Sequence, residues 1–484
     1  MTRVLAVASE AYPLIKTGGL ADVVGALPSA LKAHDVEMRV LVPGYPAVLK
    51  ALAVAEPVYR VKNLFGSEAS VLAGTGGGLD LFVLDAPHLF NRPGNPYLGP
   101  DGMDWPDNWK RFAGLSRVAS DIGRGVVKSF VPAIVHAHDW QSAMAATYLH
   151  FAPGPRARSV LTVHNLAFQG HFAATVFPDL GLPAEAFAID GIEYYGGVGY
   201  LKGGIRFADA VTTVSPTYAE EICTPVGGMG LDGLLRVRRD VLHGIVNGID
   251  TDVWNPATDT HLTRPFTAAS LASRDANKRA VEARFALESG DGMLFCVISR
   301  LTWQKGMDIL GAARDALVAA GARLAVLGSG DAALEGMFRA ATARHKGKVG
   351  VITGYDEPLA HLLQGGSDAI LVPSRFEPCG LTQFYGLRYG SVPVVARVGG
   401  LADTIIDTND AALSAGVATG MQFFPVDVAS LELAIRRAIA LYADKRTWRS
   451  IQKRGMKSDV SWAKSAGRYA ALYEALAAVP AGIA

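Results

Sequence analysis

Residues 369–382 read AILVPSRFEPCGLT, and their pattern indicates the fold class of the chain. It begins with four consecutive apolar residues, Ala369–Val372, and passes through a polar turn to a helical pattern that starts near Thr382. An uninterrupted apolar run is typical of a strand buried on both faces of a parallel sheet, whereas a half-exposed strand alternates apolar and polar residues. The stretch therefore predicts a strand, a turn able to contact a ligand, and a helix, as in doubly wound α/β domains.

The same pattern of a short apolar run followed by a longer helical segment repeats along the chain. Further runs in the first half are Val4–Ala8, Met38–Val42, Leu79–Leu84, Ala133–His136, Ser159–Val163 and Ala210–Val214. Those in the second half are Leu294–Ile298, Arg323–Leu327, Val349–Ile352 and Pro393–Ala396. The repetition predicts an α/β protein with two tandem doubly wound, Rossmann-like domains and a deep cleft between them.

A polar stretch that begins near Trp254 separates the two halves of the chain. We therefore predict a first domain over residues 1–245 and a second domain over residues 246–455. The remaining residues, 456–484, have helical spacing. An apolar stripe on this last segment is formed by Trp462, Tyr469, Tyr473 and Leu476.

The composition argues against several classes of protein. The 484 residues carry 46 Lys and Arg against 45 Asp and Glu, and a formal net charge of +1 gives no bulk attraction for nucleic acid or an anionic membrane. No apolar run approaches the roughly 18 residues that a membrane span needs, and the run after Met1 is too short for a secretion signal. The cysteines Cys223, Cys296 and Cys379 lie too far apart to indicate disulfides or a thiolate zinc site. We expect a soluble, cytoplasmic, small-molecule enzyme without a nucleic-acid or membrane partner.

Ligands bind beyond the carboxyl ends of the strands in open α/β sheets, so the residues that follow each strand are the candidate site. After the first strand, Lys16 precedes Gly18 and Gly19 at a helix start, where backbone N–H groups can meet a phosphate. An ordinary glycine-containing turn is the alternative. In the second half, Arg300 and Lys305 follow a strand and can converge on one anion, although solvated surface charges would look the same.

The stretch after Val372 places Glu377 just before another helix start. There it either accompanies a second set of phosphate-facing N–H groups or caps the helix. Cys379 has no catalytic base beside it in the sequence, so a nucleophilic role is not indicated. Two such loops, together with Arg300 and Lys305, indicate a bound nucleotide diphosphate.

Two other patterns suggest different chemistry. His136-Ala137-His138 looks like a pair of metal ligands, but no third ligand stands at a familiar spacing, so roles in the core or in positioning a substrate are favoured. The run Gly328-Ser329-Gly330, with Ala333 after it, matches the dinucleotide fingerprint. An NAD-dependent dehydrogenase is therefore an alternative, but it leaves the loops around Lys16 and Glu377 unexplained.

Taken together, these loops resemble those of the bacterial glycogen synthases and plant starch synthases. The matching pieces, in the family's order, are residues 16–24 (KTGGLADVV), Pro96-Tyr97, His138-Asp139-Trp140, His164-Asn165, Asn247-Gly248-Ile249-Asp250, Ser299-Arg300-Leu301, Gln304-Lys305-Gly306 and residues 375–383 (RFEPCGLTQ). The resemblance covers nearly the whole chain, and the joint pattern is far more specific than any single piece.

The resemblance implies a two-domain glycosyltransferase of the GT-B type. Such an enzyme would transfer glucose from ADP-glucose to the non-reducing end of an α-1,4-glucan, in glycogen biosynthesis, with retention of the anomeric configuration and without a cofactor. The first domain would serve the acceptor and the second would bind the nucleotide sugar. The resemblance also implies that the C-terminal helix within residues 456–484 crosses back onto the first domain.

The resemblance assigns site residues by matching position. Those implied to act in catalysis are Glu377, His164, Arg300, Lys305 and Asp139. Those implied to bind the donor are Lys16, Gly18, Gly19, Tyr97, Asn247, Arg300, Lys305, Tyr355, Cys379, Gly380, Leu381 and Thr382. In this scheme Arg300 and Lys305 grip the diphosphate, and Tyr355 stacks on adenine. Glu377 holds the sugar hydroxyls, while the transferred glucose is surrounded by Asp139, His164, Asn247 and Tyr97.

The wider group of retaining enzymes has a second Glu eight residues after the first, where this chain has Tyr385, so Glu377 alone carries the carboxylate role. Because no residue is an evident nucleophile for double displacement, we expect front-face attack within an ion pair. Asp250-Thr251-Asp252 matches the Asp-x-Asp of metal-dependent glycosyltransferases but follows a domain-linking turn, so we expect no metal. The remaining alternatives are a GT-B enzyme that uses UDP-glucose and a non-catalytic glucan-binding protein.

Overall fold

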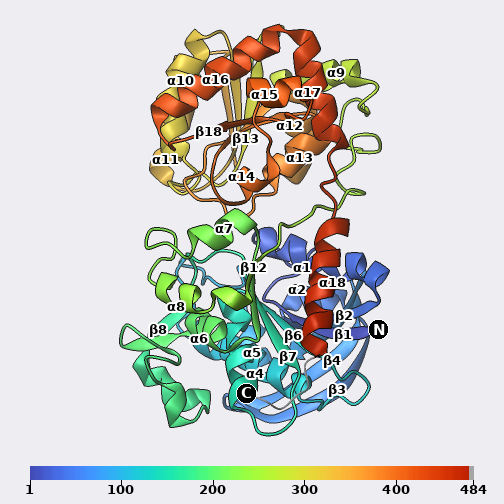
Figure 1. Cartoon of the computed structure of the whole chain (residues 1–484), viewed down its shortest axis with the longest axis vertical. Helices are drawn as coiled ribbons and strands as arrows, with labels where there is room; N and C mark the ends of the chain where they lie inside the picture. Colours follow the sequence, from blue (N-terminus) through green and yellow to red (C-terminus); the bar gives the residue numbers. More distant parts are fainter. Residues whose placement is uncertain (479–484) are drawn as a thin grey trace. The chain divides into compact units, whose positions relative to one another are not determined.

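The chain divides into two units, each built on a largely parallel sheet (Figure 1). The computed structural model describes residues 1–478, so the last six residues of the predicted C-terminal segment lie outside the described residues. Unit 1 comprises Met1–Asn247 and Trp462–Ala484, and unit 2 comprises Gly248–Ser461. The boundary predicted after residue 245 lies close to the first division. The boundary predicted after residue 455 instead falls inside helix α17 (Lys445–Lys457), whose buried Trp448 belongs to unit 2.

The main sheet of unit 1 has nine strands in the described part of the chain, in the order β12-β11-β7-β6-β1-β2-β5-β4-β3. The mutually parallel strands are β1 (Thr2–Val7), β2 (Val36–Pro43), β5 (Leu79–Asp85), β6 (Ile134–His138), β7 (Arg158–Val163), β11 (Ala210–Thr213) and β12 (Leu242–Gly244). All six predicted runs are strands. The hairpin β3 (Ala53–Leu64) and β4 (Ser67–Gly76) pairs antiparallel at the edge and was not predicted, because β3 is largely exposed and lacks an apolar run.

Helices cover this sheet, and a small second sheet lies beside it. The α-helices are α1 (Gly19–Leu31), α2 (Pro46–Ala51), α3 (Pro87–Phe90), α4 (Asn108–Gly123), α5 (Trp140–Phe151), α6 (Tyr200–Phe207), α7 (Pro216–Glu221), α8 (Asp232–Val237) and α18 (Ala463–Ala477). The 3₁₀ helices are η1 (Lys32–His34), η2 (Ala174–Leu180), η3 (Ala184–Ala186) and η4 (Arg239–Val241). The second sheet contains β8 (His171–Ala173), β9 (Glu193–Tyr194) and β10 (Gly197–Gly199).

The C-terminal helix α18 packs on unit 1, against α1 and β6. Three aromatic residues of its predicted stripe, Trp462, Tyr469 and Tyr473, are buried. The Tyr473 hydroxyl lies 2.7 Å from Nδ1 of His136, a strand residue. The chain therefore leaves unit 1 after Asn247 and returns to it at Trp462.

Unit 2 contains a parallel sheet of six strands, counted over the described residues, in the order β15-β14-β13-β16-β17-β18. The strands are β13 (Leu294–Ile298), β14 (Arg323–Gly328), β15 (Val349–Thr353), β16 (Ala369–Val372), β17 (Val392–Ala396) and β18 (Met421–Phe423). The helices, besides α17, are η5 (Leu271–Ser273), α9 (Arg274–Arg284), α10 (Met307–Ala319), α11 (Ala332–Arg344), α12 (Glu357–Gly366), α13 (Thr382–Tyr389), α14 (Gly399–Thr404), α15 (Asp410–Ser414) and α16 (Val428–Ala443). Strand and helix alternate as predicted, and two α/β domains are confirmed.

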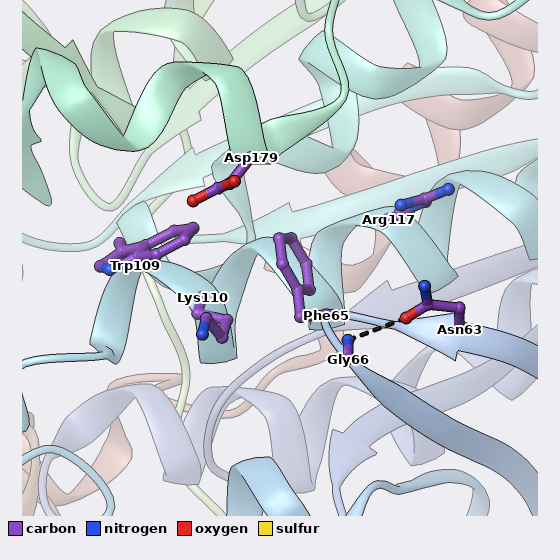
Figure 2. A pocket seen from close by; sticks show the side chains of 7 residues that line it. All are labelled: Asn63, Phe65, Gly66, Trp109, Lys110, Arg117 and Asp179. Atoms are coloured by element: carbon purple, nitrogen blue, oxygen red, sulfur yellow. Dashed lines mark hydrogen bonds between the residues drawn. The ribbon is translucent and has the colours of Figure 1, made fainter.

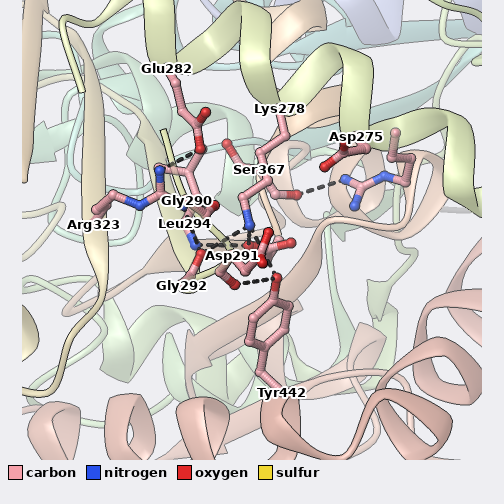
Figure 3. A network of polar contacts seen from close by, with 12 residues as sticks. Asp275, Lys278, Glu282, Gly290, Asp291, Gly292, Leu294, Arg323, Ser367 and Tyr442 are labelled. Atoms are coloured by element: carbon pink, nitrogen blue, oxygen red, sulfur yellow. Dashed lines mark hydrogen bonds and ion pairs between the residues drawn. The ribbon is translucent and has the colours of Figure 1, made fainter. Parts of the chain in front are cut away.

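A buried polar network fixes the amino ends of the central strands of unit 2 (Figure 3). Lys278 Nζ on α9 lies 2.7 Å from the Asp368 carboxylate and donates to the Tyr442 hydroxyl at 3.1 Å. The same carboxylate accepts the backbone N–H of Leu294, the first residue of β13, at 2.8 Å. Because both charges are buried and satisfied, the network orders the start of β13 and β16 without leaving an unpaired charge.

No helix within residues 1–478 is both long enough and apolar enough to cross a bilayer.

Candidate active site

The carboxyl ends of β13 and β16 lie side by side, because these strands pair in the sheet of unit 2. The loop after β13 carries Arg300 and Lys305, and the loop after β16 carries Glu377. Lys305 Nζ lies 2.6 Å from Glu377 Oε2, and Ser374 Oγ donates to the same oxygen at 2.9 Å. The structure thus joins two predicted site residues that are 72 positions apart in the sequence.

Arg300, the other predicted cation of unit 2, has no such partner among the described residues. Within the described residues, the exposed Arg300 side chain makes no hydrogen bond or ion pair, whereas Glu377 is buried to 8% exposure and neutralised by Lys305. A guanidinium presents donors in a planar fork that suits phosphate oxygens. Among the described residues, unit 2 therefore offers Arg300 without an ion-pair partner, and Lys305 ion-paired with the buried Glu377 carboxylate.

Backbone contacts hold the two loops of unit 2 together. Gly306 has φ of +67°, and a Cβ at this position would lie 1.9 Å from the carbonyl oxygen of Pro373, so only glycine fits. The Arg375 N–H donates to the Gln304 carbonyl at 2.9 Å, and the Arg375 guanidinium pairs with Asp308 at 2.7 Å. Lys305 is consequently placed by rigid neighbours on both sides.

The predicted phosphate-binding turn lies directly after Glu377. Gly380 has φ of +71°, and Leu381 occupies the N-cap position of α13 without a side-chain cap, so the helix start at Thr382 keeps its backbone donors for another partner. Cys379 is buried, and its carbonyl accepts a hydrogen bond from Gln383 Nε2 at 2.9 Å. This helix start can donate hydrogen bonds to an anion, and the phosphate contact stays a prediction.

A second pair of glycines supports that turn. A Cβ on Gly399 would lie 2.1 Å from the Glu377 carbonyl oxygen, and one on Gly400 would lie 2.3 Å from that of Cys379. The start of α14 therefore packs tightly against the backbone that carries Glu377. These supporting glycines were missed because nothing in the sequence marks a contact between segments on neighbouring strands.

The dinucleotide-like run after β14 serves a packing role in the structure. A Cβ on Gly328 would lie 1.9 Å from the Ser299 carbonyl oxygen, and one on Gly330 would lie 2.4 Å from that of Leu301. The Asp331 carboxylate caps α11 by accepting the N–H groups of Ala333 and Leu334, so that helix start is already occupied. The glycines instead support the loop that carries Arg300, which removes the observation that favoured a dehydrogenase.

Tyr355 follows β15 at an exposed position. Its side chain is 74% exposed, and its hydroxyl hydrogen-bonds to the Glu357 carboxylate. An exposed aromatic ring near the carboxyl edge of the sheet is compatible with base stacking. The adenine contact stays a prediction.

In unit 1, a buried carboxylate that the sequence analysis missed organises the loop after β1. Glu10 is 3% exposed, accepts the Thr17 hydroxyl at 2.6 Å and the Thr17 N–H, and also accepts the Tyr97 hydroxyl. Burial, and then the Glu10 charge, raises the pKa of the Tyr97 hydroxyl well above 10, so this hydroxyl stays a donor. A lone acid shortly after the first strand was the signal available in the sequence.

The predicted residues of the loop itself are exposed. Lys16 Nζ lies 2.8 Å from the Asp22 carboxylate and 5.3 Å from the centre of the Tyr12 ring. Gly18 has an extended backbone, and a Cβ there would meet nothing within 4 Å, so the space beside it is open. α1 begins at Gly19 without a side-chain cap. The loop can therefore admit an anionic ligand next to Lys16.

Asp139 connects the ends of β6 and β7. Its carboxylate accepts the backbone N–H of His164 at 2.6 Å and that of Asn165 at 3.4 Å. Its backbone has φ of 56° and ψ of −175°, a combination that is essentially restricted to glycine. Burial raises the pKa of the Asp139 carboxyl from 3.8 to about 7, although the two backbone donors oppose the rise. Backbone strain and a displaced pKa at one residue make Asp139 a candidate functional residue.

The histidines around Asp139 are neutral and hydrogen-bonded. His164 Nε2 lies 3.0 Å from His138 Nδ1, and burial lowers the pKa of His164 to about 3. His136 bonds to Tyr473 and, at 2.6 Å, to Thr162, which gives it a structural role. Within residues 1–478 no cluster of three or more His, Cys, Asp or Glu side chains is arranged to hold a metal.

Asn247, the last residue of the first segment of unit 1, has an unusual environment. It is 7% exposed, and among the described residues its Oδ1 atom has no hydrogen-bond partner. A buried acceptor without a partner is costly unless a ligand or water satisfies it.

Three residues after Asn247, the Asp250 carboxylate accepts the N–H groups of Asp252 and Val253. The Asp-x-Asp match is therefore a turn in the structure.

We predict that the ionisation of Asp139 is visible in both activity and stability. If the carboxylate is the active form, kcat rises as the pH increases through about 7, and Asp139→Asn abolishes this rise. Since the folded-state pKa lies above 3.8, the folded state binds more protons than the unfolded state between the two values. The contribution of Asp139 to stability therefore falls as the pH increases from about 4 to about 7.

Paired pH–rate profiles and thermal melts of the wild type and Asp139→Asn measure both effects. The amide introduced by this substitution cannot ionise, so the Tm of the variant relative to the wild type is expected to be higher at pH 8 than at pH 5. Parallel pH profiles for the two proteins would contradict this assignment.

Both halves of the chain resemble known protein families. The family model for the starch synthase catalytic domain matches residues 3–237, and the model for glycosyl transferases group 1 matches residues 280–454. A glycogen synthase from Mesorhizobium japonicum is 60% identical over 98% of both chains. Another from Novosphingobium aromaticivorans is 59% identical over 98% of this chain and 99% of its own.

Solved structures show the same likeness. The catalytic domain of starch synthase IV from Arabidopsis thaliana, bound to ADP and acarbose, has a TM-score of 0.85 and 31% identity, and the match covers 99% of this chain and 100% of that one. Sucrose-phosphate synthase from Thermosynechococcus elongatus has a TM-score of 0.58 at 17% identity over 98% of this chain and 99% of its own, which shows the shared fold alone.

Proposed function

The chain belongs to the family of bacterial glycogen synthases and plant starch synthases, and on that premise we propose that it transfers glucose from ADP-glucose to the non-reducing end of an α-1,4-glucan. It is a hexosyltransferase with the GT-B fold that acts in glycogen synthesis. We propose that the transfer retains the anomeric configuration. The observation that carries the assignment is the Lys305–Glu377 pair beside the uncommitted Arg300, at the carboxyl ends of two adjacent strands.

The donor site that we propose lies on unit 2. Its main contacts recognise the charge of the diphosphate, and its contact with the base is secondary. Arg300 and Lys305 bind the diphosphate, and the backbone at Gly380, Leu381 and Thr382 meets the distal phosphate. Tyr355 stacks on the adenine. ADP rather than UDP is supported by the ADP bound in the starch synthase IV structure. A UDP-glucose enzyme is the second candidate, to be separated by direct competition between the donors.

The residues of unit 1 act on the glucosyl group in this proposal. Lys16 contacts the donor phosphate, next to the open space at Gly18 and Gly19. Asn247 offers its unpartnered amide oxygen to a sugar hydroxyl, and Asp139 and His164 border the reacting carbon. The last of these residues is Tyr97, whose hydroxyl donates a hydrogen bond to the Glu10 carboxylate.

The chemistry follows from the charges. Breaking the anomeric bond leaves positive charge on the sugar and new negative charge on ADP, so cations at the diphosphate stabilise the transition state more than the ground state. The glucan hydroxyl attacks from the face that ADP leaves, and the departing phosphate accepts its proton. The carboxylate of Glu377 holds the sugar hydroxyls, while the backbone carbonyl or ring of His164 stabilises the positive sugar.

Release of ADP from ADP-glucose, measured with and without glycogen, tests the proposed transfer. Release that requires glycogen, with equal glucose gained by the polymer, is expected. Release that is independent of glycogen would show a hydrolase, and no release would leave a non-catalytic glucan-binding protein.

We also propose that the enzyme needs no divalent metal, because Arg300 and Lys305 supply the positive charge at the diphosphate. Full activity is expected after exhaustive treatment with EDTA, measured as glucose incorporated into glycogen. Strict dependence on added manganese would contradict this proposal. We further propose a cytoplasmic location, which agrees with Cys223 and Cys296 being buried and forming no disulfide within the described residues.

A further inference from the structure

A hollow on unit 1 contains none of the residues assigned to the reaction (Figure 2). It has a volume of about 300 Å³ and is formed by the β3–β4 turn, the first turns of α4, and η2. We call it the aromatic pocket. Its lining residues are Asn63, Phe65, Gly66, Trp109, Lys110, Arg117 and Asp179.

The turn that borders this pocket is strained at an aromatic residue. Phe65 and Gly66 alone connect β3 to β4, with φ of +54° and +104°. Two-residue hairpin turns with both residues at positive φ favour Asn-Gly, since a bulky side chain is disfavoured in the left-handed region. The Asn63 side chain stabilises the turn by accepting the Gly66 N–H at 2.8 Å. A strained residue of this kind indicates that its side chain has a function.

The strained turn directs Phe65 at a second aromatic ring. The Phe65 and Trp109 rings meet edge to face, with centroids 5.9 Å apart and an interplanar angle of 89°. The carbonyl of Trp109 accepts the buried Tyr200 hydroxyl at 2.8 Å, which fixes the start of α4. Both rings remain only half-buried, so a pre-organised aromatic surface faces the pocket.

Polar groups surround this aromatic surface. Within the described residues, the side chains of Lys110, Arg117 and Asp179 make no hydrogen bond or ion pair, and Lys110 lies 5.4 Å from the centre of the Trp109 ring. The pocket thus combines aromatic rings with two donors and one acceptor that make no hydrogen bond or ion pair within the described residues. A sugar ring has the complementary chemistry, with C–H groups on its faces and hydroxyl groups at its edge.

We propose that the aromatic pocket binds a glucosyl segment of the α-glucan polymer and holds the polymer on the enzyme while other residues elongate it. The volume suits a short glucosyl segment, because it lies at the lower end of the range for ligand pockets. The inference rests on the proposed function, since it takes the acceptor to be an α-glucan. The Asp179 carboxylate can accept a hydrogen bond from a sugar hydroxyl, whereas it would repel a phosphate group.

The variant Phe65→Asn gives a sharp test. It removes the ring and installs the Asn-Gly turn that the backbone prefers, so the fold should be kept, and thermal melting checks this. We expect weaker retardation in native gels that contain glycogen. The glycogen concentration needed for half-maximal rate should rise about 3- to 10-fold, as for the loss of one aromatic contact, with kcat unchanged. Trp109→Ala should act in the same direction.

The matched control is Phe424→Ala, which removes an aromatic side chain that is 72% exposed on unit 2 and should leave both measurements unchanged. If the wild type elongates glycogen but Phe65→Asn and Trp109→Ala bind it as tightly as the wild type, the pocket inference is wrong. If retardation by glycogen is relieved by glucose 6-phosphate but not by maltohexaose, the ligand is an anionic sugar and the inference is also wrong. If the wild type neither binds nor elongates glycogen, the proposed function itself fails.

Discussion

Replacing Lys305 with alanine is expected to lower kcat with ADP-glucose by about 10²–10³, as for the loss of one pre-organised electrostatic contact. Lys305 is held 2.6 Å from the Glu377 carboxylate, next to a glycine that tolerates no side chain. Its charge is therefore in place before the leaving phosphate becomes more negative. The measurement is the rate of glucose incorporation into glycogen at saturating donor.

The loss should appear in kcat at saturating donor, because the interaction strengthens as the bond breaks. Lys453→Ala, which removes an exposed lysine from α17, is the matched control and should retain full turnover. Near-wild-type turnover of Lys305→Ala at saturating donor would contradict the role assigned to this lysine.

Replacing Glu377 with glutamine is expected to reduce kcat to a similar extent, about 10²–10³. The carboxylate is buried, accepts Ser374 Oγ at 2.9 Å and pairs with Lys305, so the amide removes a charge that the site has organised on two sides. The double variant Lys305→Ala/Glu377→Gln should lose less than the product of the two single losses, because the pair acts as a unit.

Glu432→Gln provides the control for this substitution. Glu432 pairs with Arg436 on the surface of α16 at 3.1 Å, and exposed pairs of this kind contribute little. Fully multiplicative losses in the double variant would show that Lys305 and Glu377 act independently, which would count against a shared role.

The fold could be predicted because strands buried on both faces leave a strong signal. Ala369–Val372 and Leu294–Ile298 are strands with the predicted bounds, and the other apolar runs are strands whose ends differ by one or two residues. The β3–β4 hairpin gave no such signal, since its residues are largely exposed and its pairing depends on a turn with Phe65 at positive φ. Local periodicity reports burial, and it does not report edge strands that face solvent.

The candidate site could be predicted in part. Glu377, Lys305 and Asp139 stand after strands, where α/β sheets collect ligand-binding residues, and the structure places them there. The pairing of Lys305 with Glu377 could not be read from the sequence, because it depends on which strands are neighbours. Glu10 was missed for a related reason, since its partner Tyr97 is 87 residues away.

Incubation with labelled ADP-glucose or labelled UDP-glucose and glycogen shows whether the enzyme is an ADP-glucose-dependent glycogen synthase. We expect label from ADP-glucose to enter the polymer in α-1,4-linked, non-reducing terminal glucose, at a far higher rate than label from UDP-glucose. Absence of label in the polymer with both donors would contradict this expectation.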